Sequence, residues 1–424
     1  MLQLNTIREH KDEVLKGLAK KHFAKAEEII NKIIEADATR RQAQKDSDNL
    51  KSEANTISKQ VGELMKAGKK EEAEVVKTKT AELKEKEKQL GELLAEKEKE
   101  IQDLLCLVPN LPNEKVPAGK TPEENETVYK HGEIPTLHAA AVPHWDLTTK
   151  YDLIDFELGV KITGAGFPVY KGKGAKLQRA LINFFLDRAT AKGYREIMPP
   201  LMVNEASGFG TGQLPDKEGQ MYHATIDGFY LIPTAEVPIT NIYRDVILKE
   251  SELPVKNCGY TPCFRREAGS YGKDVRGLNR LHQFDKVEIV QIAHPEKSYE
   301  ILEEMKEYVA GLLQDLELPY RILRLCGGDM SFASAMTYDM EVWSAAQQRW
   351  LEVSSVSNFE AFQSNRLKCR FKGADGKTQL AHTLNGSALA LPRIVAALLE
   401  NNQTPEGIKI PKVLVPYTGF DIIN

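Results

Sequence analysis

The 424-residue sequence lacks the cysteine spacing of a metal site or a disulfide framework. It has five cysteines, an odd number, and no two of them form a CxxC pair. Cys258 and Cys263 lie five positions apart, which is a poor spacing for tetrahedral zinc. We therefore expect no structural zinc and a reduced, cytoplasmic compartment.

Long hydrophobic runs and a strong net charge are also lacking. The apolar stretch 388–399 is short and contains Pro392 and Arg393, whereas a membrane-spanning helix needs about 20 apolar residues. We therefore expect no membrane span. The formal net charge of −4 does not indicate a nucleic-acid binder, so any basic surface would have to be local.

Residues 26–102 contain no proline and no aromatic residue. Apolar or small residues recur there at alternating spacings of three and four, which places them on one stripe of a helix and predicts a left-handed supercoil. The stripe comprises Ile29, Ile33, Ala36, Ala43, Leu50, Ala54, Ile57, Val61 and Leu64, then Ala73, Val76, Thr80, Leu83, Leu90, Leu94 and Ile101. Gly68 lies between the two runs and predicts a turn. We predict a helical arm at residues 1–108, with an antiparallel coiled-coil hairpin and a short preceding helix at Ile7–Leu18.

Such an arm has little volume for a pocket and would project, brace or bind a partner. A dimerisation coiled coil or a spacer is the alternative interpretation. After it, prolines interrupt the chain repeatedly, which predicts an extended linker at residues 109–135. A length of 424 residues allows two or three domains, and residues 136–424 form the predicted body.

The body begins with a helical pattern at residues 175–192 and a strand pattern at Tyr194–Met198, which leads into Pro199 and Pro200. The glycine-rich segment Gly208–Pro215 predicts a surface loop of the kind that could close over a substrate.

The stretch Thr261–Glu288 predicts two strands joined by a long polar loop. Arg265, Arg266 and Arg276 lie in or beside that loop, and a guanidinium offers a planar fork of donors to phosphate or carboxylate oxygens. Phe284 could stack on a base, and Glu267 could accept a hydrogen bond from an exocyclic amine. A surface hairpin with a solvated charged loop is the alternative.

Residues 231–236 read LIPTAE. Acidic side chains such as Glu236 and Glu288 could hold an ammonium group, while Arg265 could reach a carboxylate or an α-phosphate. The alternative is a helix start, with Thr234 as N-cap and Glu236 in the first turn.

Two further motifs follow. Residues 352–355 read EVSS, and a carboxylate with a nearby hydroxyl could hold Mg²⁺ bridging phosphates, although a strand with exposed polar residues is the alternative. Residues 382–393 read HTLNGSALALPR, and an apolar helix follows through Leu399.

Taken in order, these segments resemble class II aminoacyl-tRNA synthetases, and seryl-tRNA synthetases in particular. The FRRE…RLHQF pattern resembles motif 2, the helix, strand and Pro200 resemble motif 1, and the segment ending at Arg393 resembles motif 3. The match departs from the generic motif 3 where Ala388, Ala390 and Pro392 replace two glycines and a glutamate. The resemblance implies an α+β fold, with the coiled-coil hairpin followed by an antiparallel-sheet catalytic domain.

The resemblance also implies residue roles. The implied catalytic residues are Arg265, Arg276 and Arg393. The implied serine-binding residues are Thr234, Ala235, Glu236, Arg265, Glu288, Asn385 and Ser387. The implied ATP-binding residues are Arg265, Arg266, Glu267, Arg276, Phe284, Glu352, Val353, Ser354, Ser355 and Arg393. The implied Mg²⁺ ligands are Glu352 and Ser355.

The activity so implied is ATP-dependent ligation of L-serine to tRNA(Ser) through a seryl-adenylate, with tRNA(Sec) as a second substrate and a homodimer as the assembly. The arm would grip the long variable arm of the tRNA. Candidate phosphate contacts on the arm are Lys59, Lys66, Lys69, Lys70 and Lys77. Two alternatives stay open, a class II synthetase for another small amino acid and a non-catalytic coiled-coil interaction protein with a synthetase-like body. The sequence has no obvious set of Cys and His zinc ligands, and this counts against threonine as the substrate.

Overall fold

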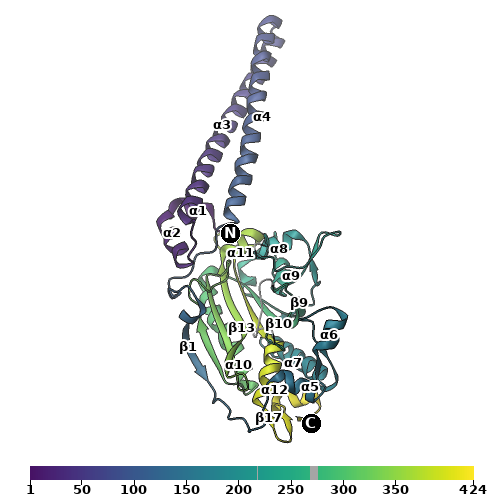
Figure 1. Ribbon diagram of the computed structural model, residues 1–424. Helices are drawn as coiled ribbons and strands as arrows, with labels where there is room; N and C mark the ends of the chain where they lie inside the picture. The colour runs from purple at the N-terminus through teal and green to yellow at the C-terminus, as the bar shows by residue number, and fades with distance from the viewer. Residues whose placement is uncertain (217, 268–275) are drawn as a thin grey trace. The chain divides into compact units, whose positions relative to one another are not determined.

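The computed structural model describes residues 1–216, 218–267 and 276–424 (Figure 1). The middle of the predicted polar loop, residues 268–275, and the side chain of Lys77 lie outside the described part. The chain divides into two compact units. One comprises Leu2–Ala19 and Phe23–Pro109, and the other comprises Met1, Lys20–His22 and Asn110–Asn424.

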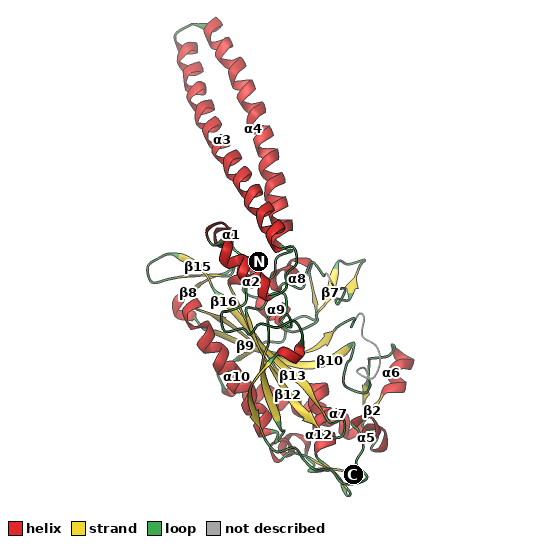
Figure 2. Ribbon diagram, turned by 60° about the vertical axis from the view of Figure 1, so that its left-hand side comes forward, coloured by secondary structure: helices red, strands yellow, loops and turns green. Residues whose placement is uncertain are grey.

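The N-terminal unit contains a long helical hairpin (Figures 1 and 2). Its helices are α1 (Leu4–Glu9), α2 (Lys11–Lys20), α3 (Ala26–Lys66) and α4 (Lys70–Leu105). The chain reverses at Gly68, whose φ of +75° lies in the left-handed region that glycine adopts readily. The predicted hairpin is therefore confirmed. The single helix predicted at Ile7–Leu18 was wrong, because His10 leaves the helical region and separates α1 from α2.

The predicted stripe forms the interface between α3 and α4, and each of its residues is buried or half-buried. Ile33 and Ala73 have no exposed surface. One charged residue, Asp37, is also buried, and it accepts hydrogen bonds from Arg40 at 2.8 Å and Arg41 at 3.0 Å. Burial opposes ionisation of Asp37, but these guanidinium groups hold the pKa of its carboxyl below the ordinary value.

The second unit is built on an eight-stranded sheet with the order β1-β11-β12-β13-β16-β10-β9-β4. The strands are β1 (Glu126–His131), β4 (Arg195–Glu196), β9 (Val255–Phe264), β10 (Gln283–Ala293), β11 (Tyr320–Arg324), β12 (Met336–Ser344), β13 (Arg349–Glu360) and β16 (His382–Ala390). Neighbouring strands run antiparallel, except that β4 is parallel to β9. Strands β9 and β10 form the hairpin predicted at 261–288. Part of the predicted linker is the edge strand β1, which pairs with β11.

The two faces of the sheet carry different elements (Figure 2). Helices α7 (Gly172–Ala191), α10 (Ser298–Asp315) and α12 (Leu391–Asn401) form one large core with one set of strand side chains, including Val287 and Ile289. The short helix α9 (Glu236–Asn241) packs on the other face, where Ile239 meets Val290. Because side chains alternate along a strand, Lys286 and Glu288 lie on the α9 face.

The remaining elements are short. They are α5 (His144–Lys150), α6 (Phe156–Ile162), α8 (Glu205–Thr211), α11 (Ala361–Leu367), α13 (Val415–Thr418), β2 (Ile154–Asp155), β3 (Val169–Tyr170), β5 (Met202–Val203), β6 (His223–Ala224), β7 (Phe229–Leu231), β8 (Ile247–Lys249), β14 (Arg370–Lys372), β15 (Thr378–Leu380), β17 (Gln403–Thr404), β18 (Gly407–Lys409) and β19 (Ile422–Ile423). None of the described helices is long and apolar enough to cross a membrane.

The loop predicted at Gly208–Pro215 was largely wrong, because its first half belongs to helix α8. Asn204 caps this helix by accepting a hydrogen bond from the Ser207 N–H at 3.0 Å. The glycines serve close packing there. A Cβ on Gly210 would lie 2.5 Å from Leu367 Cδ2, so the glycine allows α8 to approach α11.

Candidate active site

A buried polar cluster lies on the α9 face of strands β10 and β16. Glu288 is paired in register with Ser387, and Val290 with Asn385. Thr234 and Ala235 immediately precede α9, which begins at Glu236. The structure thus brings together five residues predicted to bind serine, and they come from three separate parts of the sequence. These are Thr234, Glu236, Glu288, Asn385 and Ser387, all of them buried.

Lysine 286 joins this cluster, and the sequence analysis did not assign it a role. Its Nζ lies 2.8 Å from Thr234 Oγ1 and 2.6 Å from Glu288 Oε2. Gln363 is a second addition, since its Nε2 donates to Glu236 Oε1 at 2.6 Å. The signal for Lys286 was present in the sequence, because it precedes Glu288 by two residues in a strand and must share its face. Gln363 is distant in sequence, and no local pattern marks it.

The carboxyl group of Glu236 is placed where ionisation is unfavourable. Burial, and after it the charge of Glu288, raises its pKa from an ordinary 4.5 to about 7, against the opposing hydrogen bond from Gln363. A positively charged ligand group would offset both causes, so the cluster suits an ammonium. The predicted alternative for Thr234 is also partly present, since the Glu236 N–H donates to Thr234 Oγ1 at 3.2 Å. Ala235 nevertheless occupies the N-cap position.

Arg265 lies between this cluster and the β9–β10 hairpin. Its Nε donates to the Pro233 carbonyl at 3.2 Å, and its guanidinium carbon lies 5.2 Å from the centre of the Phe284 ring. The Phe284 ring, which the sequence analysis predicts to stack on a base, is thus in contact with Arg265. The side chain of Arg265 starts at the end of the hairpin and reaches back to the residue before Thr234.

Arg266 and Glu267 follow at the start of the predicted polar loop. The Arg266 N–H donates to the Gln220 carbonyl at 2.9 Å. Glu267 accepts a hydrogen bond from Arg280 Nη1 at 3.0 Å, so its carboxylate is held by a cation from the other end of the loop.

Arg393 contacts the turn that directly follows Arg276. The guanidinium of Arg276 lies 4.6 Å from the Trp145 ring centre. Arg393 Nε donates to the Asn279 carbonyl at 3.0 Å, and Arg393 Nη1 donates to the Glu352 carbonyl at 2.7 Å. Pro392 lies in the first turn of α12, where a missing N–H is tolerated, so this departure from the generic motif is compatible with the helix.

Glu352 and Ser355 are three residues apart, and in a regular strand they would point to opposite faces. Strand β13 is irregular at this point. Asp339 pairs with Ser355 and Glu341 pairs with Glu352, with a register shift between the two pairs. This bulge lets Glu352 and Ser355 share one face.

The two intervening residues have other surroundings. Val353 packs in the hydrophobic core, and Ser354 Oγ donates to the Ser387 carbonyl at 2.6 Å. Any contact of Val353 with ATP would therefore use its backbone.

Asp339 adds a carboxylate next to this pair. Its Oδ1 is buried and has no hydrogen-bond partner in the described part of the chain. Burial and the nearby charge of Glu352 raise the pKa of Asp339 well above its ordinary value, although Ser355 supplies a hydrogen bond. An unpaired buried oxygen beside Glu352 and Ser355 fits a hard divalent cation, which takes oxygen ligands.

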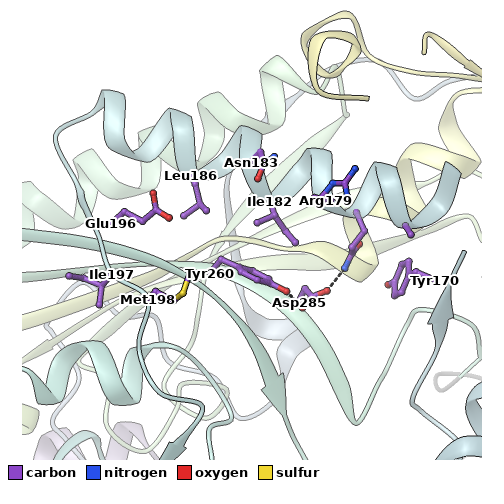
Figure 3. A pocket seen from close by; sticks show the side chains of 12 residues that line it. Tyr170, Arg179, Ile182, Asn183, Leu186, Glu196, Ile197, Met198, Tyr260 and Asp285 are labelled. Carbon is purple, nitrogen blue, oxygen red and sulfur yellow. Dashed lines mark hydrogen bonds between the residues drawn. The ribbon is translucent and has the colours of Figure 1, made fainter. Parts of the chain in front are cut away.

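A separate pocket of about 560 Å³ opens beside α7, β4 and β9 (Figure 3). At its polar end, Asp285 accepts hydrogen bonds from Tyr260 at 2.9 Å and Gln178 at 2.8 Å. Ile182, Leu186 and Met198 line its apolar part. Asp285 precedes Lys286 on β10 and points to the opposite face, so this pocket is separate from the buried polar cluster.

Comparisons with known proteins match this arrangement over the whole chain. A family model for the seryl-tRNA synthetase N-terminal domain matches residues 1–112, and a model for the tRNA synthetase class II core domain (G, H, P, S and T) matches residues 222–402. The serine--tRNA ligase of Salinibacter ruber is 51% identical over 422 residues, which cover 99% of this chain and 98% of the relative. The serine--tRNA ligase of Chlorobaculum parvum is 46% identical and matches over the full length of both chains.

A solved structure agrees with the fold. The crystal structure of seryl-tRNA synthetase from Pyrococcus horikoshii, complexed with ATP, superimposes with a TM-score of 0.94 at 33% identity and covers 100% of this chain and 99% of that one. The predicted fold class is confirmed. The chain therefore belongs to the seryl-tRNA synthetase family of class II aminoacyl-tRNA synthetases.

Proposed function

We propose that this protein ligates L-serine to tRNA(Ser) at the expense of ATP, through a seryl-adenylate. The observation that carries the proposal is the buried cluster of Glu236, Glu288 and Lys286 directly beside Arg265. The cluster offers carboxylates for an ammonium and hydrogen-bonding groups for a small hydroxyl. The adjacent guanidinium suits a carboxylate or a phosphate.

In the first step, the serine carboxylate attacks the α-phosphorus of ATP, and pyrophosphate leaves. Arg265 would hold the α-phosphate and orient the carboxylate, while Glu236 would hold the ammonium. Asn385 and Ser387 would contact the serine side chain, together with Glu288. No side-chain nucleophile is required, because positioning and charge neutralisation supply the catalysis.

The remainder of ATP would lie along the second half of the site. Arg276 and Arg393 would hold the γ-phosphate, with Arg266 near the phosphates, and Glu267 and Phe284 would recognise adenine. Glu352 and Ser355 would hold Mg²⁺, and the buried unpaired oxygen of Asp339 supports this assignment. When bound, the ion would offset the negative charge of the phosphates.

In the second step, a terminal ribose hydroxyl of tRNA attacks the activated carbonyl, AMP leaves, and the hydroxyl proton is lost. The hairpin of α3 and α4 would bind the long variable arm of the tRNA through exposed lysines such as Lys59, Lys66 and Lys70. Serylation of tRNA(Sec) and a cytoplasmic location are part of the same proposal, carried by the family membership.

The test is ATP–pyrophosphate exchange with serine, threonine, alanine and glycine at equal concentration. It needs no tRNA, so it isolates the second unit from the hairpin. We expect exchange driven mainly by serine, because buried partners of the hydroxyl would be left unpaired by alanine. Exchange led by another amino acid would overturn the substrate, and no exchange in folded protein would favour the non-catalytic interaction protein.

We also propose a homodimer that uses the surface beside α7 and β4. Met198 is 90% exposed there, and it borders the apolar side of the pocket (Figure 3). Ile197 and Leu186 lie in the same lining, so this surface carries contiguous apolar side chains of the kind that an interface covers. Sedimentation at micromolar concentration should give a dimer, and Met198→Glu should shift it toward monomer. A monomeric wild-type protein would overturn this assembly.

A further inference from the structure

A buried hydrogen-bonded pair lies behind the two arginines that we assign to the γ-phosphate. His144 begins α5 and Glu400 lies near the end of α12, and neither has any exposed surface. His144 Nδ1 is 2.7 Å from Glu400 Oε1, and the His144 backbone N–H donates to the same oxygen at 3.0 Å. Ser344 Oγ donates to the other carboxylate oxygen. Neither His144 nor Glu400 belongs to a sequence motif of the site.

The hydrogen bonds assign the protonation of this imidazole. The backbone N–H of Leu278 donates to His144 Nε2 at 2.9 Å, so Nε2 carries no proton. The proton must then reside on Nδ1, which donates to Glu400. A neutral imidazole therefore bridges the carboxylate of α12 and the backbone that follows Arg276.

Helix α5 contacts both the backbone that follows Arg276 and the side chain of Arg276. A Cβ on Gly277 would lie 2.3 Å from His144 Nε2, so only glycine lets this turn rest directly against the imidazole. Gly277 has a φ of +64°, which also favours glycine. The guanidinium of Arg276 lies over Trp145, whose ring makes an edge contact with His144 at 4.9 Å between centres.

The same carboxylate is linked to Arg393. Gln347 Nε2 donates to Glu400 Oε1 at 3.1 Å, and Gln347 Oε1 accepts from Asn279 Nδ2 at 3.0 Å. The Asn279 carbonyl in turn accepts from Arg393 Nε at 3.0 Å. The chain of contacts runs from the buried carboxylate to both guanidinium groups.

We propose that His144, oriented by Glu400, is a positioning residue for ATP binding. It holds the turn Gly277–Asn279 so that Arg276 and Arg393 converge on the γ-phosphate, and it does not touch the substrate itself. This inference rests on the proposed function, which assigns those two arginines to the γ-phosphate.

Two variants of His144 separate its two hydrogen bonds. His144→Asn keeps a donor near Nδ1 but is too short to accept from Leu278. His144→Gln places an amide oxygen near the Nε2 position and is the matched control. The full-length protein is titrated calorimetrically with ATP in the presence of Mg²⁺, and separately with AMP, which lacks the γ-phosphate.

We expect His144→Asn to raise the Kd for ATP about tenfold, the order of effect of losing one buried hydrogen bond. The Kd for AMP should stay within about twofold, and His144→Gln should stay near wild type for both ligands. Equal weakening of ATP and AMP by His144→Asn would indicate a general structural role and would overturn the inference. An unchanged Kd for ATP would overturn it as well.

A double-mutant cycle with Arg276→Ala tests the route. If His144 acts through Arg276, adding His144→Asn to Arg276→Ala should raise the Kd for ATP by less than about threefold, rather than about tenfold. The same factor in both backgrounds would overturn the inference. Wild-type affinity for ATP in Arg276→Ala alone would instead refute the γ-phosphate assignment in the proposed function.

A variant at a second residue, Gln347, tests the same inference if His144→Asn does not fold. Gln347→Leu, at a half-buried site, removes the bridge from Glu400 to Asn279 and a 3.4 Å contact with His144 Nδ1. It keeps the imidazole of His144 and its partners Glu400 and Leu278. We expect it to raise the Kd for ATP about threefold while the Kd for AMP is unchanged. Unchanged affinity for ATP, or equal weakening of both ligands, would count against the inference.

Discussion

The α3–α4 hairpin and the β10–β16 cluster use charged side chains in opposite ways. On the hairpin, Lys59, Lys66 and Lys70 are exposed, and each can contribute only a little to binding a large charged partner. In the cluster, Glu236 is 6% exposed and Glu288 is 2% exposed, and each has a defined partner. One substitution should therefore abolish binding at the cluster, whereas many residues must be changed together to abolish binding at the hairpin.

The largest effect should come from Arg265→Ala. This change removes the guanidinium that bonds the Pro233 carbonyl, next to the buried polar cluster, and lies over Phe284. We expect serine-dependent ATP–pyrophosphate exchange to fall by about a thousandfold, because one preorganised charged donor at a reacting group is worth roughly 10²–10³ and Arg265 serves two groups. The melting temperature should change little, since the side chain is only half-buried.

The matched control for this variant is Arg188→Ala, which removes an exposed arginine of α7 that pairs with Asp315 and has no role in the proposed site. Near-wild-type exchange in Arg265→Ala would contradict the assignment, as would an equal loss in both variants.

The next largest effect should come from shortening the hairpin. Glu53 and Lys79 face each other across α3 and α4 at 3.1 Å, so residues 54–78 can be replaced by a short glycine turn without changing the register below. We expect serylation of tRNA to fall by a hundredfold or more, because many weak phosphate contacts are lost together. Exchange should stay within about twofold of wild type.

This outcome would separate the two units by function. Loss of exchange in the shortened protein would contradict the division of labour, and so would retention of full tRNA charging.

The two regions also differ in how far the sequence predicts them. Spacing alone predicts the hairpin, because the contacts between α3 and α4 repeat a local period. Predicting the candidate active site required motifs, and even these leave out Lys286, Gln363 and Asp339. Gln363 lies on helix α11 and Asp339 on strand β12. Contacts between segments far apart in the sequence bring both residues to the site, and no local pattern records those contacts. The bulge that turns Glu352 and Ser355 to one face is likewise a property of the paired strands.

An intermediate effect is expected from pH and Glu236. Its pKa of about 7 means that the carboxyl is half protonated near neutrality, and the protonated form cannot hold the serine ammonium by charge. The KM for serine should therefore rise about tenfold per unit as the pH falls below 7, which is measured by exchange between pH 6 and 8.

Glu236→Gln keeps an oxygen for the Gln363 donor and should remove this pH dependence while raising the KM for serine about tenfold or more at pH 8. Because the folded-state pKa exceeds the ordinary 4.5, ionisation of Glu236 lowers stability as the pH rises from about 4.5 to 7. The Gln variant should accordingly be at least as stable as wild type at pH 8. A KM that stays flat with pH in wild type would contradict the role of Glu236.

The smallest effect should come from Asp37 in the hairpin, a buried carboxylate with three arginine partners. Asp37→Asn should lower the stability of the N-terminal unit by about 1–2 kcal/mol at pH 7, because hydrogen bonds from Arg8, Arg40 and Arg41 lose their charged acceptor. Exchange should not change. The folded-state pKa of Asp37 is held below its ordinary 3.8, so its contribution is present above that value and is lost as the pH falls further.

Thermal unfolding followed by circular dichroism should therefore separate wild type from Asp37→Asn at pH 7, and the difference should shrink as the pH falls below the ordinary pKa of 3.8. Glu53→Gln is the matched control, because its ion pair with Lys79 is exposed and should contribute well under about 1 kcal/mol. If Glu53→Gln destabilised the hairpin as much as Asp37→Asn, burial would not determine how much a charged side chain contributes to stability. The contrast between hairpin and cluster would then need another cause.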